Sequence, residues 1–129
     1  MSSSNPVVHF EMPYKDAKRV AKFYKAAFGW NMDDSGKDMG DYVTAETTKT
    51  ENGRPVAPGT INGGFFPIKP DWPAQVPSVV IAVKDIEAAM RDVKKAGGEI
   101  LGKPMDIPGV GKYVSFNDSE GNRVSLLQP

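Results

Sequence analysis

A weak internal repeat constrains the fold of this sequence more than any other feature. Sliding the chain over itself by 69 residues (85 − 16) brings identical residues together, among them Asp16 and Asp85, Lys25 and Lys94, Ala27 and Ala96, and Gly29 and Gly98. These pairs lie where a helix begins, runs and ends, which is where a duplicated fold keeps its constraints. The repeat therefore predicts two modules of one topology.

The first half reads as a strand, a helix and three further strands. Residues 7–12 alternate, which predicts a strand with Phe10 on an apolar face and His9 and Glu11 on a polar face. Asp16 is a good N-cap for a helix that Gly29 ends. We then expect strands over 30–32, 41–48 and 59–66, a loop over 49–58 and a proline-rich linker over 67–77.

The second half repeats this order. An apolar strand over 78–83 precedes a helix capped by Asp85 and stopped by Gly97-Gly98. Strands are expected over 99–101, 112–117 and 123–128. The fold class is thus α+β, with tandem βαβββ modules forming an incomplete curved barrel. We expect one domain over 1–129, with module one at about 6–66, the linker at 67–77 and module two at about 78–128.

Composition excludes several classes of function. The chain has no cysteine, so a disulfide framework and a thiolate metal site are excluded. Sixteen basic residues balance sixteen acidic ones without long runs of one sign, so neither nucleic acid nor an anionic membrane is indicated as a partner. The polar N-terminus carries no signal pattern, and no stretch is long enough to span a bilayer. We expect a cytoplasmic protein.

Two polar residues on the first strand are candidates for chemistry. His9 is the only histidine, and it is open to a role as a ligand-binding group or a general base. The structural alternative is a hydrogen bond from His9 to Glu11 or Ser125 that closes the barrel. Glu11 is either a desolvated base or a solvated rim residue. The pair Gly63-Gly64 is interpreted as a β-bulge.

Several strings resemble the vicinal oxygen chelate superfamily, which groups glyoxalase I, extradiol dioxygenases and bleomycin-resistance proteins. The resemblance covers about Val7 to Gln128 and rests on the following residues: His9, Asp16, Phe23-Tyr24 and Phe28-Gly29-Trp30 in the first half, and Val83-Lys84-Asp85, Gly97-Gly98 and Phe116 to Asn122 in the second.

In metal-using members the resemblance implies four ligands, from the first and last strand of each module. His9, seven residues before Asp16, matches the first ligand. The corresponding position before Asp85 is Ser78, the last-strand position is Ser125, and the fourth falls on Asn62 or Gly64. A neutral hydroxyl binds transition metals poorly, so we expect no cofactor. The alternative is a divalent Zn, Ni, Mn or Fe ion held by a rearranged set of His9, Glu11 and Glu46.

The resemblance therefore implies a glyoxalase/bleomycin-resistance-like protein that binds a small organic ligand in its concave cleft. His9 and Glu11 are the candidate catalytic residues. The expected ligand contacts are His9, Glu11, Asn62, Ser78, Tyr113 and Ser125. One alternative is a metal-dependent lyase, isomerase or dioxygenase, similar to lactoylglutathione lyase; another is a non-catalytic interaction module. Whether the protein is an enzyme stays open, and the resemblance suggests a homodimer with Trp72 as an interface anchor.

Overall fold

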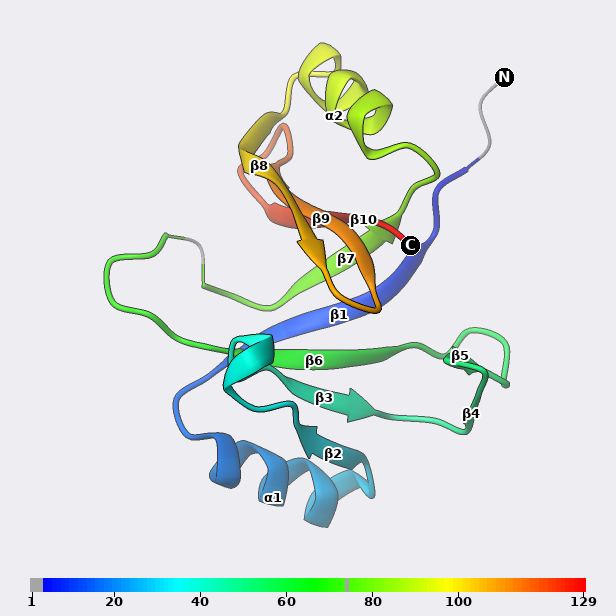
Figure 1. The fold of residues 1–129 in the computed structure, drawn as a ribbon, viewed down its shortest axis with the longest axis vertical. Helices are drawn as coiled ribbons and strands as arrows, with labels where there is room; N and C mark the ends of the chain where they lie inside the picture. Colours follow the sequence, from blue (N-terminus) through cyan, green and yellow to red (C-terminus); the bar gives the residue numbers. More distant parts are fainter. Residues whose placement is uncertain (1–3, 74) are drawn as a thin grey trace. The chain divides into compact units, whose positions relative to one another are not determined.

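The computed structural model describes residues 4–73 and 75–129, and its contacts divide the chain into two compact units (Figure 1). The first unit is His9–Pro77. The second unit is Ser78–Pro129 together with the segment up to Val8. The expected linker 67–77 groups with the first unit, and the first two residues of the first strand group with the second unit. There, the Pro6 carbonyl accepts a hydrogen bond from the Ala82 N–H at 3.0 Å.

The first unit is a mixed sheet covered by a helix. Its strands lie in the order β2-β3-β6-β1, with β1 and β6 parallel and the other pairs antiparallel. The elements are β1 (Val7–Tyr14), α1 (Ala17–Phe28), β2 (Asn31–Asp34), the 3-10 helix η1 (Lys37–Met39), β3 (Val43–Glu46), β4 (Thr50–Glu51), β5 (Arg54–Pro55) and β6 (Asn62–Pro67).

The second unit repeats this plan. Its strands lie in the order β7-β10-β9-β8, with β7 and β10 parallel and the other two pairs antiparallel. The elements are β7 (Ser78–Ala82), α2 (Ile86–Lys95), β8 (Glu99–Ile107), β9 (Gly111–Asn117) and β10 (Arg123–Gln128). In each unit the first strand pairs in parallel with the last, so the predicted βαβββ repeat and the α+β class are confirmed.

Both helices begin at the predicted aspartates. The Asp16 carboxylate accepts a hydrogen bond from the Arg19 N–H at 3.0 Å, and the Asp85 carboxylate accepts one from the Ala88 N–H at 3.1 Å. The two caps have nearly the same backbone angles, φ −141° and ψ 112° against φ −137° and ψ 105°. The repeat is therefore a repeat of conformation as well as of sequence.

The helix ends are less alike. α1 ends at Gly29, which adopts the left-handed conformation with φ 72°. α2 ends at Lys95, two residues before the position that the 69-residue shift matches to Phe28 (28 + 69 = 97), and Gly97, with φ 103°, takes the positive φ that the alignment assigns to Gly98. Across residues 4–73 and 75–129, no helix is long and apolar enough to cross a membrane.

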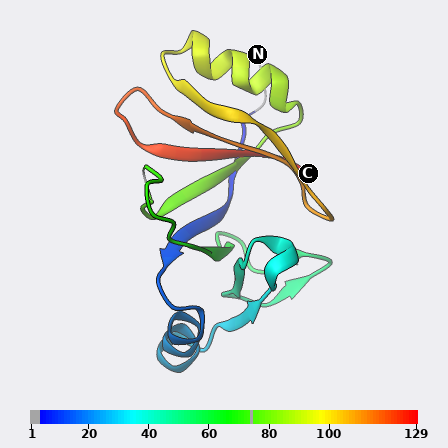
Figure 2. The ribbon, with the colours of Figure 1, turned by 60° about the vertical axis from the view of Figure 1, so that its left-hand side comes forward.

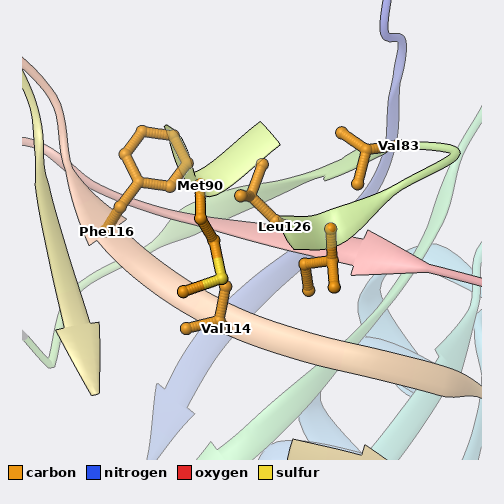
Figure 3. Close-up of a cluster of buried hydrophobic side chains, with 6 residues drawn as sticks. Val83, Met90, Val114, Phe116 and Leu126 are labelled. Atoms are coloured by element: carbon orange, nitrogen blue, oxygen red, sulfur yellow. The ribbon is translucent and has the colours of Figure 1, made fainter. Parts of the chain in front are cut away.

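Each unit has its own hydrophobic core between helix and sheet. In the second unit α2 lies along one face of the strands, and it buries Ile86 and Met90 against side chains of β9 and β10 (Figures 2 and 3). In the first unit Val43, Ala45 and Phe65 form the buried centre. α1 covers them with half-buried residues and contains no fully buried side chain.

Two predictions about the loops and strands are wrong. The expected loop over 49–58 contains the β4–β5 hairpin, because Asn52 and Gly53 both adopt positive φ, 53° and 75°, as a tight two-residue turn requires. The strand expected over 99–101 continues to Ile107 through an irregularity between Leu101 and Met105. β8 lies at the sheet edge, where a proline such as Pro104 is tolerated.

Candidate functional site

The face of the first unit's sheet that α1 leaves uncovered carries polar side chains. Phe10 and Met12 pack into the core beneath α1, so alternation along β1 directs His9 and Glu11 to the opposite face. Glu11 is buried, with 8% of its surface exposed, and His9 is half-buried. The alternation predicted for residues 7–12 is confirmed, and Glu11 is not a solvated rim residue.

Tyr42 joins His9 to Glu11. Its hydroxyl donates a hydrogen bond to Glu11 Oε2 at 3.2 Å and lies 2.9 Å from His9 Nε2. Because the single hydroxyl proton is directed to Glu11, the Tyr42 oxygen accepts the bond from His9, and Nε2 carries the imidazole proton. Nδ1 is then the basic nitrogen of the ring. We call His9, Tyr42 and Glu11 the first-unit network.

The protonation state of His9 follows from its surroundings. Burial lowers the pKa of His9 below its ordinary value of 6.5, while the Glu11 carboxylate raises it in part. Burial is the larger effect, because removing an imidazolium from water disfavours its charge. The imidazole is therefore neutral at pH 7, and Nδ1 can accept a hydrogen bond or a proton.

The glycine pair on β6 makes room for this network. Gly64 pairs with Glu11, and a Cβ atom at Gly64 would collide with the ring of Tyr42. A Cβ atom at Gly63 would collide with the ring of Phe10 on the core side. The bulge predicted here is wrong, since pairing with β1 is continuous; the glycines let an aromatic ring lie on each face of the strand.

Two further candidates in the first unit are Asn62 and Glu46. The Asn62 carboxamide accepts a hydrogen bond from the Thr47 N–H at 2.8 Å and donates one to Thr50 Oγ1 at 2.8 Å, which fixes the chain leading into β4. Its role in ligand binding stays a prediction. Glu46 is exposed on β3, where it pairs with Asn31 of β2.

A second polar cluster lies on the uncovered face of the second unit's sheet. Ser115 and Ser125 are directly paired and buried, with their hydroxyls 3.1 Å apart. The Tyr113 hydroxyl lies 2.7 Å from Ser125 Oγ, and Arg123 Nη2 donates to Ser115 Oγ at 3.0 Å. We call these four residues the Arg123 cluster. Tyr113 and Ser125 were predicted from the sequence; Ser115 and Arg123 were missed.

Ser78 lies on the strand next to this cluster. Within the described ranges its Oγ is buried without a hydrogen-bond partner. Alternation places Ser78 on the same face as Val80, which pairs with Ser125. The structure thus brings His9 together with Glu11 in the first unit, and Tyr113 together with Ser125 in the second unit. Ser78 lies on the same uncovered sheet face as Tyr113 and Ser125.

The strand registers decide between Asn62 and Gly64 as the fourth ligand position of the resemblance. Glu11 pairs with Gly64, and Val80, which lies 69 residues after Glu11, pairs with Ser125. Gly64 is therefore the equivalent of Ser125, and it has no donor side chain.

The residues at the four implied positions do not fit a transition metal. They supply one imidazole, the hydroxyls of Ser78 and Ser125, and no side chain at Gly64. A stable site needs three or more nitrogen, carboxylate or thiolate donors. Over residues 4–73 and 75–129, no group of three His, Cys, Asp or Glu side chains is placed to hold an ion, including the alternative set with Glu46.

Comparison with known sequences gives a consistent family. The sequence profile of the Glyoxalase/Bleomycin resistance protein/Dioxygenase superfamily matches residues 7–126. CFP32 of Mycobacterium tuberculosis, provisionally named a glyoxylase, is 31% identical over 116 residues, which cover 88% of this chain and 41% of that protein. A glyoxylase-like domain-containing protein of Didymella fabae is 30% identical, with 87% and 84% covered. The chain spans about two-fifths of the length of the mycobacterial relative.

Solved structures show the same fold. Methylmalonyl-CoA epimerase of Streptomyces coelicolor, in complex with 2-nitronate-propionyl-CoA, superposes with a TM-score of 0.71 at 17% identity, covering 97% of each chain. Methylmalonyl-CoA epimerase of Mycobacterium tuberculosis gives a TM-score of 0.69 at 13% identity, covering 100% of this chain and 93% of that one. At these identities the likeness establishes the fold alone.

Proposed function

Because this chain belongs to the Glyoxalase/Bleomycin resistance protein/Dioxygenase superfamily, we propose that it binds a small organic molecule on the uncovered sheet faces, without a resident metal ion. The observation that carries this proposal is the first-unit network. It holds a neutral imidazole, a tyrosine hydroxyl and a buried carboxylate together on a face that contributes nothing to the hydrophobic core.

The network is suited to hold a polar group of a ligand. Buried polar groups normally satisfy one another or a ligand, and here Tyr42 ties down the Nε2 end of the imidazole. Nδ1 then accepts a hydrogen bond from the ligand, or removes a proton from it as a general base. The buried Glu11 carboxylate fixes the direction of the Tyr42 hydroxyl and thereby the tautomer of His9.

The metal-dependent lyase, isomerase or dioxygenase is the competing function. It needs an ion that polarises two neighbouring oxygens of the substrate. The donor set at the implied positions argues against it, because the second unit offers hydroxyls where a carboxylate or an imidazole would be required.

Native mass spectrometry of the gently purified protein tests the proposal. We expect a bound small molecule that is lost in His9→Gln, since glutamine can still donate to Tyr42 but has no basic nitrogen equivalent to Nδ1. Lys22→Gln, an exposed change on α1, is the matched control and retains the molecule. A ligand retained equally by both variants contradicts a role for His9.

A metal titration separates the competing function. After chelation, Zn, Ni, Mn and Fe ions are added in turn while the melting temperature is followed. A resident metal raises the melting temperature by mass action. We expect no rise with any of the four; a rise that disappears in His9→Gln favours the metal-dependent alternative.

A homodimer and a cytoplasmic location belong to the same proposal. Trp72, the predicted interface anchor, is 62% exposed, and the Lys69 amine lies 4.7 Å from its ring centroid. An exposed ring on a proline-rich connector is suited to pack against a second copy. Light scattering of the purified protein, compared with Trp72→Ser, tests this; a monomer at high concentration would overturn the dimer.

A further inference from the structure

The first unit contains the same dipeptide, Asn-Gly, in two different surroundings. Asn52-Gly53 forms the turn of the β4–β5 hairpin, and Asn62-Gly63 begins β6. An asparagine that precedes glycine is the most reactive kind in a protein, because a residue without a side chain leaves its backbone nitrogen open to the asparagine carboxamide. The surroundings in the fold then decide which of the two pairs reacts.

The first pair lies at an exposed tip. Asn52 and Gly53 are both exposed, and a Cβ atom at Gly53 would lie in open space. β4 and β5 are two residues long each and form a sheet of their own, apart from the main sheet. Their hairpin extends beyond the ends of β3 and β6 (Figure 1). A hairpin this short is only marginally stable by itself, so its tip opens at little cost in free energy.

The second pair is held in place. The Asn62 carboxamide accepts a hydrogen bond from the Thr47 N–H and donates one to Thr50 Oγ1, both at 2.8 Å. Gly63 is buried, and it pairs with β1 on one side and with β3 on the other. Rotation of the backbone at Asn62 would therefore disturb the pairing of three strands as well as two side-chain hydrogen bonds.

We propose that Asn52 is a site of spontaneous deamidation in the folded protein, independently of the proposed function. The Gly53 backbone nitrogen attacks Cγ of Asn52 and closes a five-membered succinimide ring. The bond from Cγ to the side-chain nitrogen breaks, and this nitrogen leaves as ammonia with the proton that the Gly53 nitrogen gives up. Water then opens the ring: cleavage of the bond to Cγ yields aspartate, and cleavage of the bond to the main-chain carbonyl carbon yields isoaspartate. The reaction consumes one water molecule and needs no oxidant or reductant.

The two products affect the hairpin differently. Each adds a negative charge next to Glu51. Aspartate tolerates the positive φ of the turn, which is 53° at Asn52. Isoaspartate adds a carbon atom to the main chain, so the turn is no longer the two-residue connection that the pairing of β4 with β5 requires. We therefore expect the isoaspartate form to lose the hairpin.

Peptide mapping of the folded protein after incubation in mildly alkaline buffer tests this inference. Mass spectrometry detects deamidation as the mass gained when –NH₂ is replaced by –OH, and electron-transfer fragmentation distinguishes isoaspartate from aspartate. We expect Asn52 to react at least about tenfold faster than Asn62, because opening the hairpin costs less free energy than opening β6. In urea, where both pairs are exposed, the two rates should become similar. Asn52→Gln, whose ring would need six members, should remove the product at this position and leave the rate at Asn62 unchanged.

Three outcomes would overturn the inference. The first is reaction of Asn62 as fast as Asn52 in the folded protein. The second is an Asn52 that stays intact in the folded protein although it reacts in urea. The third is a difference between the two rates that persists in urea, since it would then come from the neighbouring sequence and not from the fold. The comparison uses the wild-type protein, so its outcome does not depend on the folding of any variant.

Discussion

The first and second units place different side chains on the corresponding face of one sheet topology. Strand pairing aligns Thr44 with Ser115 and Gly64 with Ser125, which makes Tyr42 and Tyr113 equivalent. Each tyrosine hydroxyl lies in the polar cluster of its own unit. Around Tyr42 the partners are an imidazole and a carboxylate; in the other cluster they are serines and a guanidinium. One plan thus carries a carboxylate on one face and a guanidinium on the other.

The helices differ in a second way. α2 buries Ile86 and Met90, whereas α1 buries no residue completely. The aspartate caps are the same, so the local signals that start a helix have been kept while the packing beneath it has changed. Local hydrogen bonding and tertiary packing are therefore separable parts of the repeat, and each can be tested in both units.

The largest expected effect concerns the helices' contribution to stability. Ile86→Ala should lower the free energy of unfolding by about 2 to 5 kcal/mol, because it leaves a cavity in a closed core. Val20→Ala on α1 should cost less than about 2 kcal/mol, because Val20 is only half-buried. Urea denaturation of both variants measures the difference. Equal losses would show that α1 is as tightly packed as α2.

The next effect concerns the glycines of β6. Gly63→Ala and Gly64→Ala should each cost about 1 to 3 kcal/mol by overpacking, with Gly63→Ala the larger. The Phe10 ring over Gly63 packs against the core, whereas the Tyr42 ring over Gly64 lies on the opposite face of the strand. Only Gly64→Ala should also raise the pKa of His9 toward its ordinary value, by opening the network. An NMR titration of the imidazole checks this, and an unchanged pKa would contradict it.

The next smaller loss of stability is expected at the two helix N-caps, and it should be similar in both units. Asp16→Ala and Asp85→Ala should each cost about 1 kcal/mol, since each removes one side-chain hydrogen bond to the first turn of a helix. The matched conservative variants, Asp16→Asn and Asp85→Asn, should retain most of the stability. Thermal denaturation of the four variants is the measurement; a clearly unequal pair of alanine losses would break the equivalence of the two caps.

The smallest effect is a pH dependence confined to the first unit. The pKa of His9 is lowered in the folded state. As the pH falls below about 6.5, the unfolded chain therefore binds more protons than the folded protein does. Stability is therefore lost on acidification, from the ordinary pKa of histidine down through the folded one. His9→Gln should remove this part of the pH dependence, as it removes the only histidine. Urea denaturation at pH 7.5 and 5.5 measures the free energy of unfolding of the wild type and of His9→Gln. If this free energy changes equally with pH in both proteins, a lowered pKa of His9 is contradicted.

The sequence predicted what local chemistry decides. The caps at Asp16 and Asp85 and the alternation around His9 follow from residues close together in the chain, and all are confirmed. The bulge predicted at Gly63-Gly64 is wrong because its cause lies elsewhere: the rings that cover these glycines come from Phe10 and Tyr42.

The candidate site was predicted only in part for the same reason. Tyr42 reaches Glu11 across 31 residues of sequence, and the register that aligns them could not be fixed by pattern alone. A signal was nevertheless present. The segments Tyr42-Val43-Thr44 and Tyr113-Val114-Ser115 are similar, but they lie 71 residues apart (113 − 42) instead of 69, so a rigid shift of the sequence missed them.

The aromatic rings over Gly63 and Gly64 have a spectroscopic consequence. A ring held against a glycine shields or deshields the α-protons beneath it, so the resonances of these two residues report separately on the two sides of one strand. Gly64 senses the Tyr42 side and Gly63 senses the Phe10 side. A molecule that displaces Tyr42 would shift the Gly64 resonances and leave the Gly63 resonances unchanged. Gly63 thus serves as an internal reference when binding of a molecule beside Tyr42 is followed.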